Sequence, residues 1–350
     1  MSSHDQQPVG VLQAFVPALD AVTVRQVAPP EPAPDEVVVR MLLTGICGSD
    51  THAIAGHHPL LKPPYVPGHE AIGLVETCGT QVSGLQTGQR VVLKPNVVCG
   101  HCVNCLAGRS NACVELAWIG CDPSGQHPGA MADLFLAPAR NLYPVPEGIS
   151  DHQAALVECL ATPVHAVRIA GDLTDATVVI LGGGTIGVLT LLAARKAGAR
   201  AVVITDLDPV KRERAVRLGA AAGLDAADPA LPAQVTEALG GRADVLFDCV
   251  AAEGSARQWT ALVRRAATVV LVGVPARDYV VPTVQLQDWE LRLQGSASYT
   301  EADFETALSL GGEIPAEEIV TDVLDLTEAA SAFSRAIAPG VGKVLVSARS

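Results

Sequence analysis

The chain has 350 residues, of which 49% are apolar and 17% charged, so it can build packed cores and is too apolar for a disordered chain. Because domains usually contain about 100–200 residues, this length predicts two domains. The sequence has 24 Lys and Arg against 37 Asp and Glu, and its formal charge of −13 argues against a general binder of nucleic acid or anionic membranes.

Short apolar segments separated by Gly and Pro make up the first part of the chain, to about residue 150. They include residues 36–43, 71–78, 90–93 and 134–137. Short strands punctuated by turn residues are typical of a small β-barrel or β-sandwich with functional loops. We therefore expect a β-rich first domain.

Strand and helix patterns alternate from about residue 151 onward. After a helical pattern at 151–169, we predict strands at 177–181, 201–205, 244–248 and 268–272, and helices at 186–197, 209–218 and 255–266. Short Val, Ile and Leu strands alternating with helices indicate a parallel sheet covered on both faces, and hence an α/β fold. The tail, with predicted strands at 290–294 and 343–346 and a helix at 301–310, could belong to either domain.

No export or membrane signal is visible in the sequence. The N-terminal residues are polar and lack a basic segment followed by an apolar one. Residues 177–194 form the longest apolar stretch, but three glycines at 182–184 interrupt it and favour a strand, a turn and a helix over a membrane span. The odd number of cysteines, nine, suits metal binding better than disulfides. We therefore expect a cytoplasmic protein with reduced thiols.

A glycine-rich turn follows the predicted strand 177–181. Gly182, Gly184 and Gly187 form a GxGxxG motif between a strand and a helix, which is the context this motif requires. The first glycine permits a tight turn, the second lets a pyrophosphate approach the backbone, and the third lets helix and strand pack closely. The helix N-terminus offers free N–H groups to phosphates, here best from Thr185 and Ile186. The motif predicts a dinucleotide-binding site.

Asp206 is the second element of this predicted cofactor site. It follows the strand 201–205, nineteen residues after the last glycine of the motif. An acid there can accept hydrogen bonds from ribose hydroxyls and repels a 2′-phosphate, which favours NAD over NADP. Lys211 and Arg212 lie nearby and could contact or shield the ribose. In the alternative interpretation, Asp206 only caps the helix that begins at Pro209.

Four cysteines within fifteen residues form a CxxCxxCx7C pattern, Cys99, Cys102, Cys105 and Cys113. Four thiolates from one loop can surround zinc at Zn–S distances of about 2.3 Å, and a site without an open position is structural. The first three have ferredoxin-like spacing, but the fourth interval is long and the usual Cys-Pro ending is absent, so zinc is favoured over an iron–sulfur cluster. His101 is expected to face solvent.

Two short fragments carry further potential metal ligands. One is GICGSDTH at 45–52, which contains Cys47, and the other is PGHE at 67–70, which contains His69 and Glu70. A thiolate, an imidazole and a carboxylate are suitable zinc ligands. Taken alone, the fragments fit a small buried cysteine and a structural histidine at least as well.

Together, the motifs GICGSDxxH, PGHE, CGxCxxCx7C and GxGxxG make the whole chain resemble the zinc-dependent medium-chain dehydrogenase/reductase family, and its polyol and threonine dehydrogenase branch in particular. The resemblance implies a catalytic domain with a GroES-like β-barrel, formed by residues 1–153 and 290–350 and carrying both zinc sites. It also implies a doubly wound Rossmann domain with a parallel sheet, which binds NAD and spans residues 154–289.

The resemblance assigns a catalytic zinc ion to Cys47 and His69. Its third ligand is Glu70 or Glu158, and the two carboxylates exchange at the metal in some members of the family. The polyol and threonine branch has an acid at the position of Glu158, whereas alcohol dehydrogenases of the ethanol type have a cysteine there. Because Cys159 stands beside this position, the identity of the third ligand stays open, with Glu158 preferred.

Further roles follow from the same resemblance. Asp50 would orient the zinc-bound histidine. Ser49 and His52 would relay a proton between the reacting oxygen and solvent. Thr162 would contact the nicotinamide, and Val272 would contact its carboxamide through the backbone.

The implied reaction is a hydride transfer between a secondary alcohol and NAD, from alcohol to ketone or the reverse, with one catalytic and one structural zinc ion per chain. The expected substrate is a polyol, cyclitol or hydroxy-amino acid. The expected assembly is a homodimer or homotetramer without nucleic acid or membrane partners. Two alternatives remain open. The same site could serve a biosynthetic reductase or a transient oxidation within a larger reaction, or the chain could be a non-catalytic zinc-binding or DNA-binding protein.

Several other residues are given ordinary structural roles. Cys78, Cys121 and Cys249 have no partner by spacing and are interpreted as small apolar fillers. His165 is expected to be a packed or interdomain histidine. Trp118 either lines the substrate cleft or packs below the cysteine loop.

Overall fold

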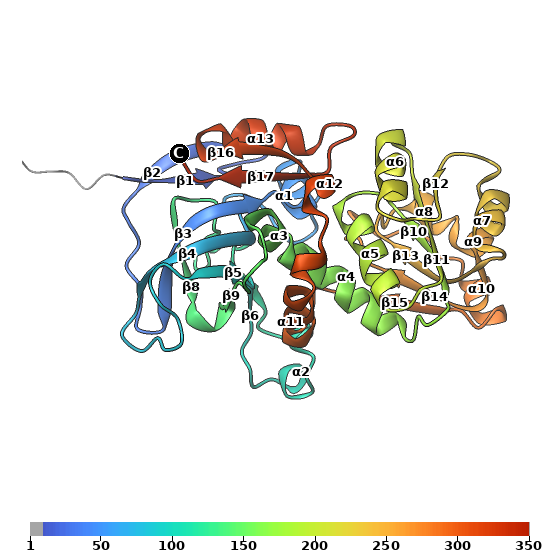
Figure 1. The fold of residues 1–350 in the computed structure, drawn as a ribbon, viewed down its shortest axis with the longest axis horizontal. Helices are drawn as coiled ribbons and strands as arrows, with labels where there is room; N and C mark the ends of the chain where they lie inside the picture. Colours follow the sequence, from blue (N-terminus) through green and yellow to red (C-terminus); the bar gives the residue numbers. More distant parts are fainter. Residues whose placement is uncertain (1–9, 350) are drawn as a thin grey trace, which may run out of the picture.

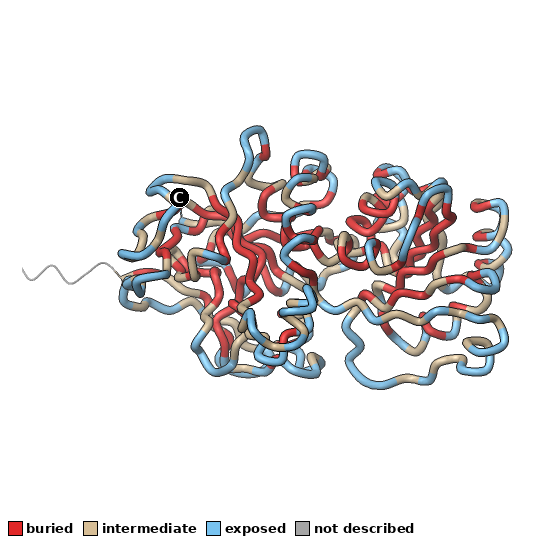
Figure 2. The backbone as a smooth tube through the Cα atoms, turned by 90° about the horizontal axis from the view of Figure 1, so that it is seen from below, coloured by how far each residue is buried: buried red, intermediate tan, exposed pale blue. Residues whose placement is uncertain are grey.

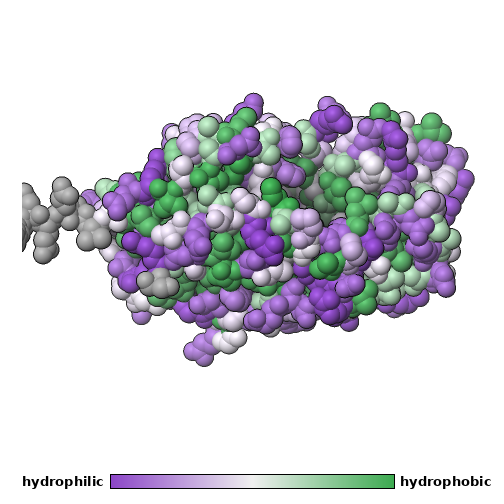
Figure 3. Space-filling model, turned by 90° about the horizontal axis from the view of Figure 1, so that it is seen from above, coloured by the Kyte–Doolittle hydropathy of each residue, from purple (hydrophilic) through white to green (hydrophobic). Residues whose placement is uncertain are grey.

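A computed structural model describes residues 10–349 and shows two lobes connected by a central helix (Figure 1). The first lobe contains the N-terminal β-rich region together with the C-terminal strands, and the second contains the alternating strands and helices of the middle of the chain. Buried residues concentrate in the interior of each lobe (Figure 2). On the face seen in Figure 3, the surface is hollowed between the lobes.

The first lobe is built on a seven-stranded sheet with the order β16-β17-β3-β4-β5-β9, in which β8 also pairs with β3. Its strands are β3 (Glu36–Gly45), β4 (Glu70–Cys78), β5 (Arg90–Leu93), β8 (Leu134–Pro138), β9 (Leu142–Pro144), β16 (Val320–Asp325) and β17 (Lys343–Ser347). Strands β3 and β4 run antiparallel with Gly45 opposite Glu70, and Leu345 of β17 lies on the other side of Gly45. This register brings the C-terminal strand next to the loops that carry the predicted metal ligands.

Smaller elements surround this sheet. Two short antiparallel pairs join β1 (Val11–Phe15) to β2 (Thr23–Val27), and β6 (Asn96–Val97) to β7 (Ala117–Trp118). The helices of the lobe are α1 (Gly48–Ile54), α2 (Val103–Leu106), α3 (Asp151–Ala155), α11 (Glu301–Ser309), α12 (Ala316–Ile319) and α13 (Ala329–Ala336), with 3-10 turns at Ser110–Ala112, Ala139–Asn141, Gly311–Glu313 and Leu326–Glu328. Apolar side chains from the sheet and from α13 fill the core, among them Val39, Met41, Phe135 and Phe333.

The second lobe is a six-stranded parallel sheet with the order β12-β11-β10-β13-β14-β15. Its strands are β10 (Thr177–Leu181), β11 (Ala201–Asp206), β12 (Ala222–Asp225), β13 (Ala243–Asp248), β14 (Val263–Leu271) and β15 (Arg292–Gly295). Its helices are α5 (Thr185–Lys196), α6 (Pro209–Arg217), α7 (Leu231–Leu239), α8 (Glu253–Ala256), α9 (Trp259–Leu262) and α10 (Thr283–Asp288). Every residue of β10 is buried, as expected for a central strand covered on both faces. The predicted doubly wound α/β fold is confirmed.

Helix α4 (Val157–Ala170) connects the two lobes and packs against α5 and α11. The predicted helix at 151–169 is in fact two helices, α3 and α4, which are separated at Leu156. Leu156 and Leu160 are buried in one cluster with Ile72 of the first lobe and Val178 of the second. Through α4, the two lobes share a continuous apolar core.

Two predictions about the second lobe need correction. The predicted helix 255–266 ends at Leu262, because the next residue, Val263, begins β14 and pairs with Ala243. The predicted end of the nucleotide-binding domain at 289 precedes β15, whose Leu293 pairs with Val269 of β14, so the parallel sheet continues to Gly295. The division into domains otherwise stays a prediction. Among the described residues, we find no helix with the length and apolarity needed to cross a bilayer.

Candidate active site and metal sites

Four residues predicted to serve the catalytic metal come together at the start of β4 next to α4. Ligand atoms of Cys47, His69 and Glu70 all lie within 4.8 Å of one another. A second group with the same spacing contains Glu70, Glu158 and Cys159. The loop between β3 and α1 supplies the thiol, the start of β4 supplies the imidazole and one carboxylate, and the first turn of α4 supplies the other carboxylate.

Glu70 is held by a buried ion pair that sequence reasoning missed. Nζ of Lys343 donates hydrogen bonds to both carboxylate oxygens, at 2.8 and 2.7 Å, and a third to the carbonyl of Ile46 at 3.1 Å. Lys343 is 4% exposed and Glu70 is 1% exposed. Although burial alone would raise the pKa of Glu70, the ammonium group lowers it, so this carboxyl is ionised. A lysine at the head of the apolar strand 343–346 was the available signal, because such a lysine needs a buried acid.

Gly45 makes room for this carboxylate. A Cβ atom at Gly45 would lie 1.9 Å from Oε2 of Glu70, far inside van der Waals contact. Because Lys343 holds both oxygens, the Glu70 side chain cannot turn away without breaking the ion pair. The glycine is therefore required by the position of the carboxylate.

Glu158 is held differently. The hydroxyl of Tyr299 donates to its Oε1 atom at 2.7 Å, and Oε2 has no hydrogen-bond partner among residues 10–349. Burial raises the pKa of Glu158 to about 7, and the negative charge of Glu70 adds to this effect. Burial likewise raises the pKa of the Cys159 thiol well above its usual value. Cys159 is therefore a neutral thiol beside two carboxyl groups.

His69 has two possible partners for its Nδ1 atom. The Sγ atom of Cys121 lies 3.4 Å away, at hydrogen-bond distance, and Oδ2 of Asp50 lies 3.8 Å away. Asp50 itself accepts from the backbone N–H of Cys47 at 3.2 Å and faces the hydroxyl of Tyr65. Our interpretation of Cys121 as an apolar filler was wrong, because this thiol contacts the predicted ligand more closely than Asp50 does.

The residues of this cluster fit a divalent cation such as zinc. Burial would lower the pKa of His69, but negative charge on Cys121, Asp50 and Cys47 raises it well above the usual value. The raised pKa of His69 marks a negative potential at this imidazole, which favours a positive ion. Thiolate, imidazole and carboxylate are the donors that zinc takes in catalytic sites.

Ser49 and His52 lie on successive turns of α1. The Ser49 hydroxyl is buried and has no hydrogen-bond partner among the described residues, so no bond joins it to His52. His52 is exposed, and both partial burial and the nearby His57 lower its pKa. The helix presents a neutral imidazole at the surface three residues after a hydroxyl without a partner.

Aromatic rings border the cluster on the side of Tyr299. The indole of Trp118 meets the His69 ring edge-on, with centroids 6.3 Å apart, and meets the Tyr299 ring at 6.2 Å. Tyr299 in turn packs against Phe304 of α11 at 5.8 Å. Only 3% of the chain is aromatic, and this row brings several of those residues to one place.

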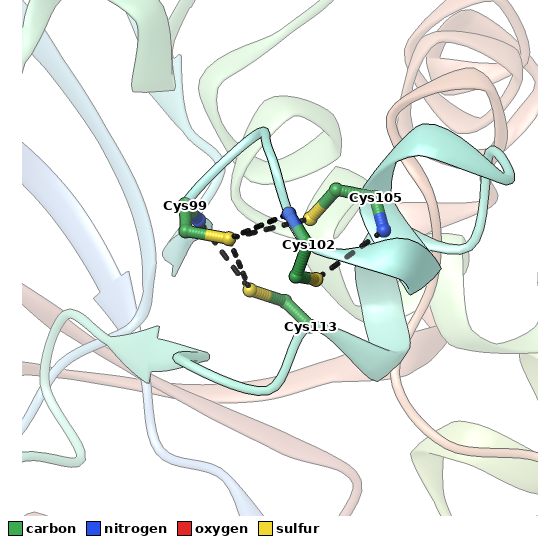
Figure 4. Close-up of side chains that lie close together, drawn as sticks. All are labelled: Cys99, Cys102, Cys105 and Cys113. Atoms are coloured by element: carbon green, nitrogen blue, oxygen red, sulfur yellow. Dashed lines mark hydrogen bonds between the residues drawn. The ribbon is translucent and has the colours of Figure 1, made fainter.

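The cysteine quartet closes on itself in the loop between β6 and β7 (Figure 4). All four Sγ atoms lie within 4.8 Å of one another, with Cys99 at 3.5 Å from Cys113 and at 4.0 Å from Cys105. The backbone N–H of Cys102 donates to Sγ of Cys99 at 3.4 Å. Hydrogen bonds from the backbone, chiefly that of Cys105, lower the pKa of Cys102 to about 6. Four converging sulfurs, with the backbone prepared for thiolates, fit a tetrahedral zinc ion.

His101 of the same loop takes no part in the quartet. It is exposed, its Nδ1 atom lies 2.9 Å from the carbonyl of Cys99, and its Nε2 atom lies 3.8 Å from the carboxylate of Glu115.

The glycine-rich turn has the geometry that a pyrophosphate requires. Gly182 has a φ of 96°, in the left-handed region that favours glycine. A Cβ at Gly187 would lie 1.8 Å from the Gly182 carbonyl, whereas a Cβ at Gly184 would meet nothing within 4 Å. The first and last glycines therefore serve the turn, and the middle one leaves open space in front of α5, which begins at Thr185 and continues through Ile186.

Asp206 ends β11 and stabilises this turn. Its Oδ2 atom accepts from the N–H of Gly183 at 2.7 Å, and Oδ1 accepts from the N–H of Asp208 at 2.8 Å. The cap of α6 is Asp208, so the alternative interpretation of Asp206 as only a helix cap was wrong. Lys211 lies beside Gly183, and Arg212 donates to the carbonyl of Asp206 and forms an ion pair with Asp225 at 3.3 Å.

The two residues predicted to contact the nicotinamide lie on α4 and at the end of β14. Thr162 is half-buried on α4, one turn after Glu158. Val272 follows β14, is 6% exposed, and donates its N–H to the carbonyl of Asp248.

Comparisons with known proteins agree with this architecture. Residues 33–147 match the alcohol dehydrogenase GroES-like domain, and residues 185–312 match the zinc-binding dehydrogenase domain. The chain is 32% identical over 311 residues to D-xylulose reductase A of Aspergillus niger, which covers 86% of each protein. The predicted GroES-like lobe is thereby confirmed.

Solved structures are similar over almost the whole chain. A candidate zinc-binding dehydrogenase from Sinorhizobium meliloti, bound to NADP, has a TM-score of 0.88 and 32% identity, with 97% of this chain and 99% of that one covered. The 2R,3R-butanediol dehydrogenase of Bacillus subtilis has a TM-score of 0.87 and 25% identity, with 96% and 99% covered. The protein is thus an oxidoreductase of the alcohol and polyol dehydrogenase kind. The chain belongs to the zinc-dependent medium-chain dehydrogenase/reductase family and is polyol dehydrogenase-like.

Proposed function

We propose that this protein oxidises a secondary alcohol to a ketone with NAD, or catalyses the reverse reaction, on a polyol, cyclitol or hydroxy-amino acid. The observation that carries the proposal is that Cys47 and His69 meet Glu70 in one group of potential metal ligands, and that Glu70 also belongs to a second group with Glu158. When bound there, zinc supplies the Lewis acidity that favours loss of the alcohol proton. The nicotinamide supplies the hydride acceptor or donor.

Glu158 is the third zinc ligand in our proposal. Lys343 already neutralises Glu70 and occupies both of its oxygens, while Oε2 of Glu158 has no partner in the described part of the chain. Burial raises the pKa of the Cys159 thiol well above its usual value, which favours Glu158 over Cys159 as the ligand. Glu70 can reach the metal only when it releases Lys343, so its role in the exchange expected for this family depends on that ion pair.

Ser49 and His52 form the proton path in our proposal. The buried Ser49 hydroxyl has no partner in residues 10–349, so it is free to accept the proton of a substrate hydroxyl and pass its own proton on. His52 is one turn later on the same helix and exposed, and its lowered pKa keeps it neutral near pH 7 and able to accept a proton. The arrangement moves a proton from the buried site to solvent.

NAD is the cofactor that the second lobe favours. Asp206 places a carboxylate at the end of β11 next to the glycine turn, where it can accept hydrogen bonds from ribose hydroxyls. Arg212 is occupied by Asp225 and by backbone carbonyls, which leaves it poorly placed to bind a 2′-phosphate. Lys211 contacts the cofactor beside Asp206, and Thr162 and Val272 contact the nicotinamide ring and its carboxamide.

Metal analysis combined with a cofactor and substrate screen tests the proposal. We expect two zinc ions per chain and a change in nicotinamide absorbance with NAD, larger than with NADP, on at least one polyol, cyclitol or amino alcohol. An Asp206→Ala variant should reduce the preference for NAD. Fewer than two zinc ions, or no absorbance change across the panel, would contradict the proposal. Substrate turnover without any net absorbance change would favour a transient oxidation instead.

A further inference from the structure

Asp303 on α11 is the centre of a buried network that lies outside the proposed metal sites. It is 1% exposed, and its carboxylate accepts from the N–H and the hydroxyl of Thr300 at 2.8 and 2.7 Å. It also lies 2.8 Å from Nδ1 of His165 and accepts from Nε of Arg168 at 2.6 Å. Burial raises the pKa of Asp303, but these donors outweigh burial and lower it below its usual value. The network is therefore built around a charged carboxylate.

The network joins two helices that each carry a part of the proposed active site. His165 and Arg168 belong to α4, whose first turn contains Glu158. His165 follows Glu158 by seven residues, so two helical turns place both on the same face of α4. Asp303 belongs to α11. The N-cap residue of α11 is Thr300, which directly follows Tyr299.

Tyr299 connects the same two segments inside the active site. Its hydroxyl donates to Oε1 of Glu158 at 2.7 Å, and its side chain is buried. Because Asp303 accepts both the N–H and the hydroxyl of Thr300, it fixes the backbone of the residue that follows Tyr299. Two contacts between α4 and the start of α11 therefore lie about 10 Å apart along the helix. The Asp303 network holds the backbone of Thr300. The Tyr299 hydroxyl, on the neighbouring residue, donates to a carboxyl oxygen of Glu158.

We infer that Asp303 is a positioning residue, which keeps the Tyr299 hydroxyl on Oε1 of Glu158 and so leaves Oε2 directed to the catalytic metal. This inference rests on the proposed function, because it takes Glu158 as a zinc ligand. Partners that orient a metal ligand commonly change metal affinity by about 10- to 100-fold when removed. A purely structural role for Asp303 would affect stability without any link to Tyr299.

The test measures release of zinc to a chelator from the zinc-loaded chain and from Asp303→Asn, Tyr299→Phe and double variants. We expect each single variant to release one of its zinc ions about 10-fold faster than the original chain. The double variant should be no faster than the faster single variant, because both changes act through one bond. If Asp303→Asn does not fold, Arg168→Gln replaces it in the same zinc-release measurement. This variant removes one donor to Asp303 from a half-exposed side chain, so we expect a smaller loss of stability.

A matched control is available in the second lobe. Asp244 accepts from the N–H and hydroxyl of Thr177 and from Nε of Arg264, which matches the threonine and arginine donors of Asp303 without its histidine, and it belongs to none of the clusters of potential metal ligands among the described residues. Asp244→Asn should lower thermal stability and leave the rate of zinc release unchanged. Equal release rates for Asp244→Asn and Asp303→Asn, or independent and multiplicative effects of Asp303→Asn and Tyr299→Phe, would overturn the inference.

A crystal structure of Asp303→Asn separates failure of the inference from failure of the proposed function. We expect the Tyr299 hydroxyl to lie beyond hydrogen-bond distance of Glu158, whether or not zinc is bound. A bond retained at the original length overturns the inference by itself. A displaced Tyr299 in a chain that never holds a second zinc ion or reduces NAD would support the positioning and reject the proposed function.

Discussion

The cysteine loop and the inner cluster are two proposed metal sites of opposite construction. The loop takes four ligands from fifteen consecutive residues, 99–113, and backbone N–H groups of the same segment support its sulfurs. The inner cluster takes its ligands from three separate elements, and the side chains that support it, Lys343 and Tyr299, come from the last fifth of the chain. One site is local, and the other exists only in the folded first lobe with α4 in place.

This difference separates what each metal contributes. A loop of two short helical segments and few buried residues has little core of its own, so its metal serves folding. The inner cluster is surrounded by a sheet, α4 and α11, which have large apolar cores of their own, so we expect its metal to serve chemistry more than folding. Loss of either ion should therefore change different properties of the same chain.

Cys47→Ser gives the largest expected effect on activity. The variant should lose the inner zinc ion and lower kcat/KM by about 1,000-fold or more, because several kcal/mol of electrostatic stabilisation disappear with the metal. Its melting temperature should stay near that of the original chain, since the surrounding core is intact. Zinc content, steady-state rates and calorimetry on the same preparation provide the measurement. A large fall in melting temperature would show that the inner cluster is also structural.

Cys105→Ser tests the other side of the comparison. The variant should lose the loop zinc ion and lower the melting temperature by about 4 °C, which corresponds to about 3 kcal/mol for a chain of this size. The inner zinc ion should be retained. Metal analysis and calorimetry measure both properties, and Cys78→Ser, at a cysteine outside both clusters, is the matched control. A variant that melts like the original chain would show that the loop does not need its metal.

Gly45→Ala tests whether the inner cluster depends on its distant supports. A methyl group there would collide with Oε2 of Glu70 and force the carboxylate off Lys343. We expect kcat/KM to fall by about 10- to 100-fold, with less effect on the loop zinc ion. Gly48→Ala adds the same methyl group three residues later, at the start of α1, where nothing lies within 4 Å, and should be nearly silent. Equal activities of the two variants would contradict a role for the Glu70–Lys343 pair.

The sequence could predict the local sites but not the contacts between distant segments. The quartet and the glycine turn are local patterns, so spacing alone identified all their members. The pairing of Glu70 with Lys343 spans 273 positions, and no periodicity connects two such residues. The contact of Cys121 with His69 and the Tyr299–Glu158 bond are tertiary for the same reason. Similarly, β12 was missed because its sequence, AGLD, has low strand propensity and pairs only through its position beside β11.

The smallest expected effect concerns pH and the Asp303 network that supports the inner cluster. The pKa of Asp303 in the folded chain is below its usual value of 3.8. A depressed pKa means that the carboxylate contributes stability above about pH 4 and that this contribution is lost as the pH falls toward the folded-state pKa. Asp303→Asn should therefore be less stable than the original chain by about 2 kcal/mol at pH 7, and the difference should shrink below about pH 4.

Urea unfolding of both chains across this pH range measures the difference directly. Because Asp303→Asn is expected to weaken the inner metal site, both chains are compared after removal of zinc, and the remaining pH dependence of the difference then belongs to the Asp303 contacts. A difference that stays constant down to low pH would mean that packing, and not charge, joins α11 to α4. In that case α11 would be held against α4 by shape alone, and Lys343 would remain the one long-range charged support of the inner cluster among the described residues.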